Sequence, residues 1–285
     1  TKNIIFTRSF EINELVKKTP SKREGISNNE RTSRCGLYGS QLIFENTYIV
    51  LTYCFERIPI EPVERVASQY NVTVQYAKCN STYGKIEANE VGTIFHWIID
   101  NWSKIKNGSI SKVIFHHAHE HSPHQEGNTL SRQLVKLFNA YSYFCGRDFG
   151  EVYPFYIEHE LINETAFICA YNFIETLDTL TRGTSFAHFN RSNSKNTWRS
   201  GRNSAFFVSA KALTKNHKLS DYKKFLNNIH ETVVNLDPKL TREKYRRSTN
   251  FYVGECVERA WYVLFTNQTY SDYQFPKSFG KFIIA

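Results

Sequence analysis

The chain has 285 residues, of which 41% are hydrophobic and 15% aromatic, enough to build a sizeable core, and this composition excludes a disordered polypeptide. It contains no run of about 18 apolar residues, so the sequence predicts no membrane-spanning helix. The net charge of +9 comes from lysines and arginines scattered over several segments, without an RNA-recognition, zinc-finger or helix-turn-helix signature, which disfavours nucleic acid as a partner.

Cysteines and glycosylation sequons indicate the compartment in which the chain folds. The six cysteines are even in number and lack the C-x-x-C spacing of a zinc or redox site, which makes two or three disulfides plausible. Six buried thiols in a cytosolic protein are the alternative. Seven N-x-S/T sequons are also present, at Asn71, Asn80, Asn101, Asn107, Asn163, Asn190 and Asn267. Together these features favour a disulfide-bonded glycoprotein of the secretory-pathway lumen or the cell exterior.

The order of the predicted elements indicates the fold class. Residues 1–39 are polar and interrupted by Pro20 and Gly25, so they predict an N-terminal arm before a single α/β domain over 40–285. Strands and helices then alternate: a strand within 42–53, a helix over 59–70, a strand over 72–78, an amphipathic helix over 91–105 and a buried strand over 112–117. Such alternation predicts a mostly parallel sheet with helices on both faces and a functional crevice beyond the carboxyl ends of its strands.

The second half of the chain is less regular. A helix is expected over 130–143, a strand with its loop over 151–160, and an amphipathic segment of either type over 165–180. A polar loop of about 20 residues over 181–202 is long enough to suggest a functional lid. A short strand over 204–209 and helices over 222–235 and 256–265 follow.

Histidines gather at the end of the strand predicted over 112–117. The segment FHHAHEHSPHQEG contains five of them, at His116, His117, His119, His121 and His124. Alternation along a strand places His117, His119 and His121 on one side, where neutral imidazoles with a nearby glutamate, Glu120 or Glu126, bind a divalent transition metal. The alternative is that one or two of these histidines cap backbone groups while the others lie in a solvated loop.

Several standard catalytic motifs are missing from the sequence. It has no G-x-S-x-G elbow, P-loop, G-x-G-x-x-G turn or D-x-D pair after a strand, which removes the simplest hydrolase, NTPase, dinucleotide-binding and metal-dependent sugar-transferase signatures. Four carboxylates are candidates for a general base, namely Glu158, Glu160, Glu255 and Glu258.

Four blocks of residues resemble a family of fungal, algal and protist proteins that are grouped as a domain of unknown function. The family block F-x-H-x-H-x-x-S-W-H is matched by Phe115, His117, His119, Ser122 and His124. The block A-Q-F-x-V-S is matched by Phe206, Val208 and Ser209, with Ser204 in the first position, and E-R-x-W-H-x-x-F by Glu258, Arg259, Trp261 and Phe265. The block N-V-G-R-E-x-H-x-Y-L is matched in part, by Val91, Gly92 and His96.

The resemblance implies a fold and a chemistry. The family is similar in layout to nucleotide-sugar glycosyltransferases of the GT-A kind, and its members look like luminal type II proteins. By this resemblance His117, His119 and His124 would hold a divalent metal, Mn²⁺ or Zn²⁺, or a diphosphate. Glu258 would be a base or a structural anchor, and Arg259 would offset phosphate charge. The expected partner is then a nucleotide sugar or a glycan.

Departures from the family pattern support an alternative. Thr93 and Ile94 stand where the family has Arg and Glu, and Pro123 and Tyr262 replace a Trp and a His. If the missing Arg and Glu bind substrate in the family, this chain has lost them. The alternative is therefore a non-catalytic extracellular structural protein that keeps the fold and binds assembly partners.

Overall fold

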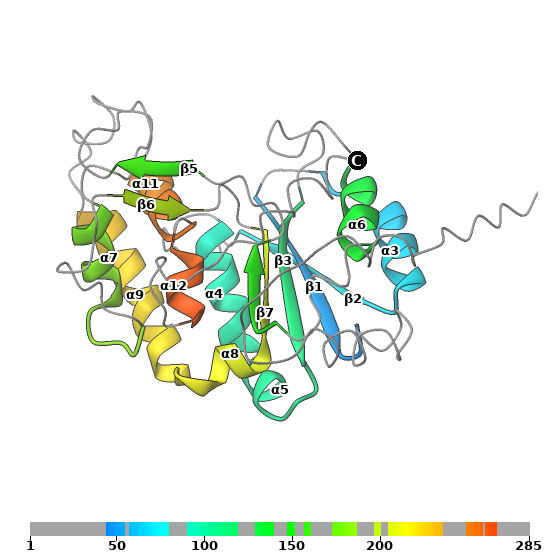
Figure 1. The fold of residues 1–285 in the computed structure, drawn as a ribbon, viewed down its shortest axis with the longest axis horizontal. Coiled ribbons are helices and arrows are strands. Elements are labelled where there is room, and N and C mark those ends of the chain that lie inside the picture. Colours follow the sequence, from blue (N-terminus) through cyan, green and yellow to red (C-terminus); the bar gives the residue numbers. More distant parts are fainter. Residues whose placement is uncertain are drawn as a thin grey trace, which may run out of the picture.

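The computed structural model describes residues 44–54, 57–79, 90–118, 129–139, 147–151, 157–160, 173–186, 197–200, 205–235, 249–258 and 260–266. These residues form an α/β fold with a five-stranded sheet and a separate two-stranded ribbon (Figure 1). The N-terminal arm expected over 1–39 lies outside the described residues.

From one edge of the main sheet to the other, the strands are β2 (Thr73–Lys78), β1 (Thr47–Tyr53), β3 (Lys112–His117), β7 (Phe206–Ser209) and β4 (Phe149–Glu151). The first three strands pair in parallel, whereas β7 is antiparallel to both β3 and β4. The prediction of a mostly parallel sheet therefore holds only in part, because the sheet is mixed. β7 follows a polar segment rather than a predicted helix, so no β-α-β crossover imposes parallel pairing on it.

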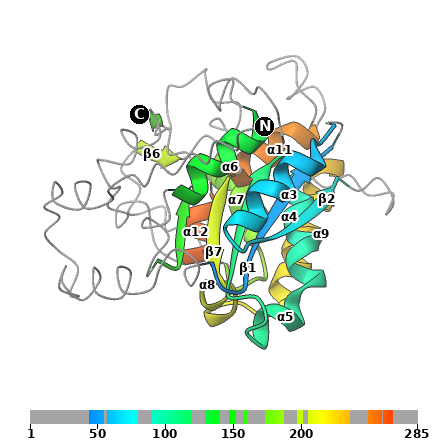
Figure 2. The same cartoon turned by 90° about the vertical axis from the view of Figure 1, so that its right-hand side faces the viewer.

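Helices cover both faces of this sheet, as expected from the alternation. On one face lie α3 (Ile60–Gln69) and α6 (Leu130–Asn139), which pack on the β3 residue Ile114 and its neighbours. Figure 2 shows these two helices on the side of the sheet that faces the viewer. Helix α3 carries Pro62 in its first turn, where the helix needs no backbone N–H from that residue.

The opposite face carries the larger core. Val113 and Phe115 of β3 point to this face, where they pack against α4 (Glu90–Asp100), α9 (Leu219–Asn235), α11 (Thr249–Glu258) and their neighbours. Helices α7 (Phe173–Thr181), α8 (Ala210–Lys215) and α12 (Trp261–Thr266) also contribute to this cluster. The fully buried ring of Phe206 lies 4.8 Å from that of Trp261 and 5.4 Å from that of Phe265, measured between centroids. These ring contacts hold α12 against the sheet.

Two predicted helices are each divided in the structure. The helix expected over 91–105 becomes α4 and α5 (Trp102–Lys106), separated at Asn101. The Asn101 side-chain amide donates to the Trp97 carbonyl at 3.0 Å, a competition with the backbone that favours a helix end. The helix expected over 256–265 is instead the end of α11 followed by α12, with a tight turn in which Ala260 N donates to Val257 O.

Two other predictions were wrong in detail. The segment 151–160, expected to be a strand with its loop, contributes its first residue to β4 in the main sheet and its last four to β5 (Ile157–Glu160) in the ribbon. The polar loop expected over 181–202 contains β6 (Thr197–Ser200), which pairs with β5 in antiparallel fashion. Residues 187–196 and 201–202 lie outside the described residues, and the lid stays a prediction.

A cluster of hydrogen bonds joins the turn after α7 to the start of α9. Ser185 Oγ donates to Asp221 Oδ2 at 2.7 Å, and the backbone N–H of Lys218 donates to the same oxygen at 2.7 Å. The Ser185 hydroxyl also lies 2.9 Å from His217 Nδ1. Burial alone would raise the pKa of the Asp221 carboxyl, but these hydrogen bonds outweigh burial and lower the pKa below its usual value.

The lowered Asp221 pKa predicts a pH-dependent contribution to stability. The native state binds fewer protons at this carboxyl than the unfolded state, so the contribution is present above about pH 4, the usual pKa of Asp, and is lost as the pH falls further. Asp221→Asn should cost about 1 kcal/mol near neutral pH, because Asp221 caps the first turn of α9. Urea unfolding at several pH values tests this, with the exposed Asp100→Asn as control. A loss that stays constant down to about pH 3 would contradict the assignment.

Candidate functional site

The candidate site lies where the sheet topology reverses. From β1 the chain passes through α3 on one face to β2, and then through α4 and α5 on the other face to β3, which pairs with the opposite edge of β1. The carboxyl ends of β1 and β3 therefore form a topological switch point, the place at which open α/β sheets bind ligands. Thr52 and His117 are direct partners in the register at this edge.

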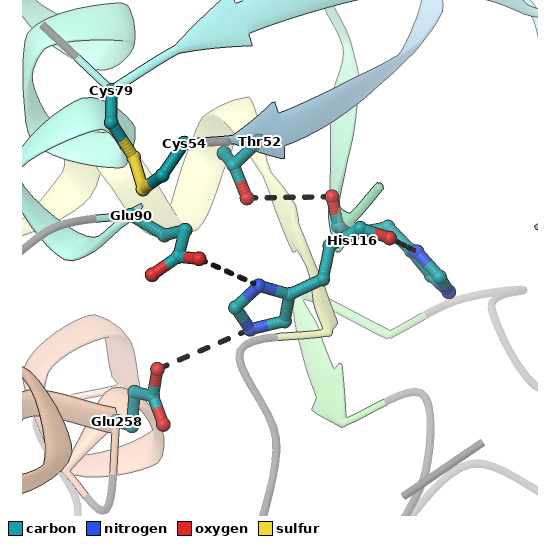
Figure 3. The surroundings of a disulfide bond; sticks show 7 residues. Thr52, Cys54, Cys79, Glu90, His116 and Glu258 are labelled. Carbon is teal, nitrogen blue, oxygen red and sulfur yellow. Dashed lines mark hydrogen bonds and ion pairs between the residues drawn. A yellow bond between two sulfur atoms is a disulfide. The ribbon is translucent and has the colours of Figure 1, made fainter. Parts of the chain in front are cut away.

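His117 lies between two carboxylates at this edge. The residue is 8% exposed and belongs to the face of β3 that carries Phe115. Its Nδ1 lies 3.6 Å from Glu90 Oε1, and its Nε2 lies 4.0 Å from Glu258 Oε1 (Figure 3). Glu90 is the first residue of α4 and Glu258 is the last residue of α11. Three segments that are distant in the sequence thus bring an imidazole and two carboxylates together.

The neighbouring His116 has a structural role. It is fully buried, and its Nδ1 donates to the His117 carbonyl at 2.6 Å. The Thr52 hydroxyl donates to the His116 carbonyl at 3.5 Å (Figure 3). His116 therefore satisfies a backbone group at the end of β3, as the alternative interpretation of the cluster proposed for one or two of its members.

A disulfide borders the site. Cys54 and Cys79 follow β1 and β2 and are joined with a Cα–Cα distance of 4.7 Å. Their sulfur atoms and a carboxylate oxygen of Glu90 lie within 4.8 Å of one another. Sulfurs joined in a disulfide offer no thiolate, so this group is not a metal site. Cys256 in α11 is also disulfide-bonded, and no cysteine of the described part of the chain is free. These bonds are compatible with a secreted or luminal protein.

The other residues predicted for the site are distributed as follows. His119, His124 and Arg259 lie outside the described residues, as do His121, Glu120 and Glu126. Glu158 and Glu160 belong to the β5–β6 ribbon rather than to the main sheet. Glu255 is half-buried in α11, one turn before Glu258. Of the predicted ligands and catalytic residues, the structure thus brings His117 and Glu258 together.

The gap beside His117 has room for one divalent cation. Metal–nitrogen and metal–oxygen distances are each about 2.0–2.2 Å, so one ion could contact both His117 Nε2 and Glu258 Oε1, which are 4.0 Å apart, at a wider angle than in a tetrahedral site. Glu90 faces the other ring nitrogen, the position from which a carboxylate commonly orients a metal-binding histidine. Two ligands do not complete a coordination shell, so further donors would have to come from outside this pair.

Glu90 is the functional candidate that sequence reasoning missed. It matches none of the family blocks, and it lies just before the helix that the sequence predicts over 91–105. The signal that could have identified it is positional, because a carboxylate in the first turn of a helix that follows a parallel strand lies at the carboxyl edge of the sheet. Its position also places a negative charge at the positive end of the α4 dipole.

None of the helices in the described ranges has the length and apolar character needed to cross a membrane. Comparisons of the chain with protein-family models, with curated proteins and with solved structures gave no match.

Proposed function

We propose that this chain is a glycosyltransferase-like domain of the secretory pathway or the cell exterior that binds a nucleotide sugar and transfers its sugar. The observation that supports this proposal most is the position of His117 between Glu90 and Glu258 at the switch point of the sheet. The resemblance of the histidine and E-R-x-W blocks to a glycosyltransferase-like family supports it independently.

Each residue of the cluster has a role in the proposed reaction. His117 in its neutral form and Glu258 would hold a divalent cation, which when bound offsets the charge of the diphosphate leaving group. Glu90 would keep the His117 ring in a productive orientation through Nδ1. By the family resemblance Arg259, the residue after Glu258, would add positive charge toward the diphosphate.

Glu258 has a second candidate role as the base that accepts the proton of the acceptor hydroxyl. The carboxylate is partly exposed, with 22% of its side-chain surface accessible, and so remains within reach of a substrate. The two roles give different results in the same variant. In Glu258→Gln a ligand role predicts loss of metal affinity, whereas a base role predicts retained metal and nucleotide binding with loss of sugar transfer.

A non-catalytic assembly protein is the second candidate function. The observation that favours it concerns α4, where Thr93 and Ile94 occupy the positions at which the family has Arg and Glu. Ile94 is fully buried in the core and Thr93 is 8% exposed. Thr93 and Ile94 therefore contribute to the packing of the core and carry no charge. A domain that has lost two charged residues in this way can still keep its fold.

The experiment that separates the two functions is a titration of the full chain, produced by secretion. Calorimetry with Mn²⁺ and with Zn²⁺ near pH 7.5 should show stoichiometric binding, which weakens as the pH drops below neutrality because a metal binds only the neutral imidazole. A panel of nucleoside diphosphate sugars should then bind only when the metal is present. Absence of both metal and nucleotide-sugar binding would end the enzyme proposal and favour the assembly protein.

A further inference from the structure

Three of the sequons fall within the described residues, and all three lie in turns at one edge of the sheet. Asn71 lies between α3 and β2, Asn101 between α4 and α5, and Asn107 between α5 and β3. These turns come before β2 and β3 in the chain, at the amino edge of the parallel strands, and the turns of Asn101 and Asn107 flank α5. The candidate site lies at the carboxyl edge, one strand length or about 17–20 Å away.

Asn107 has the environment of a glycan acceptor. It is exposed, and its Oδ1 accepts a hydrogen bond from the backbone N–H of Ser109 at 3.0 Å. This bond uses only the side-chain carbonyl, so it leaves the amide nitrogen of the exposed side chain, the atom that becomes glycosylated, available for reaction. Gly108 adopts a φ of 83° in this turn, and a Cβ at Gly108 would meet no atom within 4 Å. The space beside the acceptor is therefore open to a bulky oligosaccharide.

Asn71 is the second acceptor with open surroundings. It is exposed in the tight turn between α3 and β2, with a φ of 55°, a conformation that Asn tolerates better than most residues. Thr73, the hydroxyl residue of its sequon, is exposed at the start of β2. β2 is the outermost strand of the described sheet on that side, so no further described strand crowds the turn.

Asn101 differs from the other two. It is half-buried, and its amide nitrogen donates to the Trp97 carbonyl at 3.0 Å. The next residue, Trp102, packs against Tyr222 with ring centroids 5.3 Å apart. The acceptor nitrogen of this sequon is thus engaged inside a helix junction, where a glycan would have to displace packed groups.

We infer that the protein carries N-linked glycans at Asn71 and Asn107 and none at Asn101, so that these two glycans stand on the edge opposite the candidate site. In the reaction the asparagine amide nitrogen loses a proton and bonds to the anomeric carbon of an oligosaccharide, which leaves its polyisoprenyl diphosphate carrier. The inference rests on the secretory route of the proposed function but not on its chemistry. Glycans there would also exclude the amino edge as a protein-binding face.

The test is glycopeptide mass spectrometry of the full chain secreted from a eukaryotic host. Intact glycopeptides must be read, because Asn107 precedes Gly108 and Asn-Gly pairs deamidate spontaneously, which imitates the product of enzymatic deglycosylation. We expect glycans on the peptides of Asn71 and Asn107 and an unmodified Asn101. Ser109→Ala provides a matched variant, since it destroys the sequon while the bond from the residue 109 backbone to Asn107 persists.

Thr73→Ala destroys the Asn71 sequon in the same way and leaves Asn71, the residue with positive φ, unchanged. These two variants should each lose one glycan, whereas Ser103→Ala, which removes the Asn101 sequon, should leave the mass of the glycans unchanged. A glycan at Asn101, or bare Asn71 and Asn107 on a chain glycosylated at other sequons, would overturn this inference alone. A chain without any glycan would overturn both the inference and the secretory route.

Discussion

Replacement of His117 by Ala is expected to remove stoichiometric Mn²⁺ or Zn²⁺ binding and, with it, the metal-dependent binding of a nucleotide sugar. The expectation follows from the position of His117 Nε2, which faces Glu258 across a gap that one cation can span. Glu90→Gln should weaken metal affinity by about 10–100-fold, because it removes the carboxylate that orients the ring rather than a ligand. The loss of metal affinity in His117→Ala should exceed that range.

The measurement is a calorimetric titration of each variant beside the wild-type chain. Glu61→Gln is a suitable control, since Glu61 forms an exposed ion pair with Arg65 on α3, across the sheet from the site. This control should bind metal as the wild type does. Unchanged metal affinity in His117→Ala would show that any bound metal is held elsewhere, and His117 would then be a structural residue.

Phe206→Ala is expected to cause the largest loss of stability among the single changes considered. Phe206 is fully buried, and its ring lies 5.2 Å from Phe115, 5.7 Å from Phe149 and 4.8 Å from Trp261, measured between centroids. Truncation removes these contacts and leaves a cavity that rigid aromatic neighbours fill poorly. The expected cost is about 3–5 kcal/mol in the free energy of unfolding.

Urea or guanidinium unfolding measures this cost, with Val234→Ala as the control. Val234 is 59% exposed on α9, so its truncation should change stability by less than about 0.5 kcal/mol. Because Phe206 packs on α12, which follows Glu258, the variant should also weaken metal binding if it is still folded. A cost below about 1 kcal/mol would mean that the aromatic cluster collapses onto the cavity far more completely than usual.

The first half of the fold could be predicted from the sequence because its signals are local. A periodic apolar pattern marks each of the elements β1, α3, β2 and β3. Because strands that alternate with helices form a parallel sheet, the order of these elements predicts their parallel pairing. The antiparallel pairing of β7 could not be predicted in this way. It depends on which distant strand edge is free when the chain returns to the sheet, and no pattern within residues 206–209 specifies that edge.

The candidate site shows the same division. His117 was identified by the histidine cluster and by its place at the end of a buried strand, and Glu258 by the E-R-x-W block. Their proximity depends on how α11 lies on the sheet, which is decided by packing of rings such as Phe206 and Trp261. No sequence pattern identifies Glu90 as a site residue, because a single glutamate before an apolar helix is common on protein surfaces.

The long sequence separation between β3 and β7 has a consequence for biosynthesis. Phe115 pairs with Phe206, which is synthesised roughly 90 residues later, whereas Cys54 and Cys79 are only 25 positions apart. On a growing chain the crosslink beside β1 and β2 can therefore form while the far edge of β3 still lacks its partner. Until β7 arrives, that edge exposes unpaired backbone groups to other chains. We expect the nascent domain to depend on chaperones for this interval.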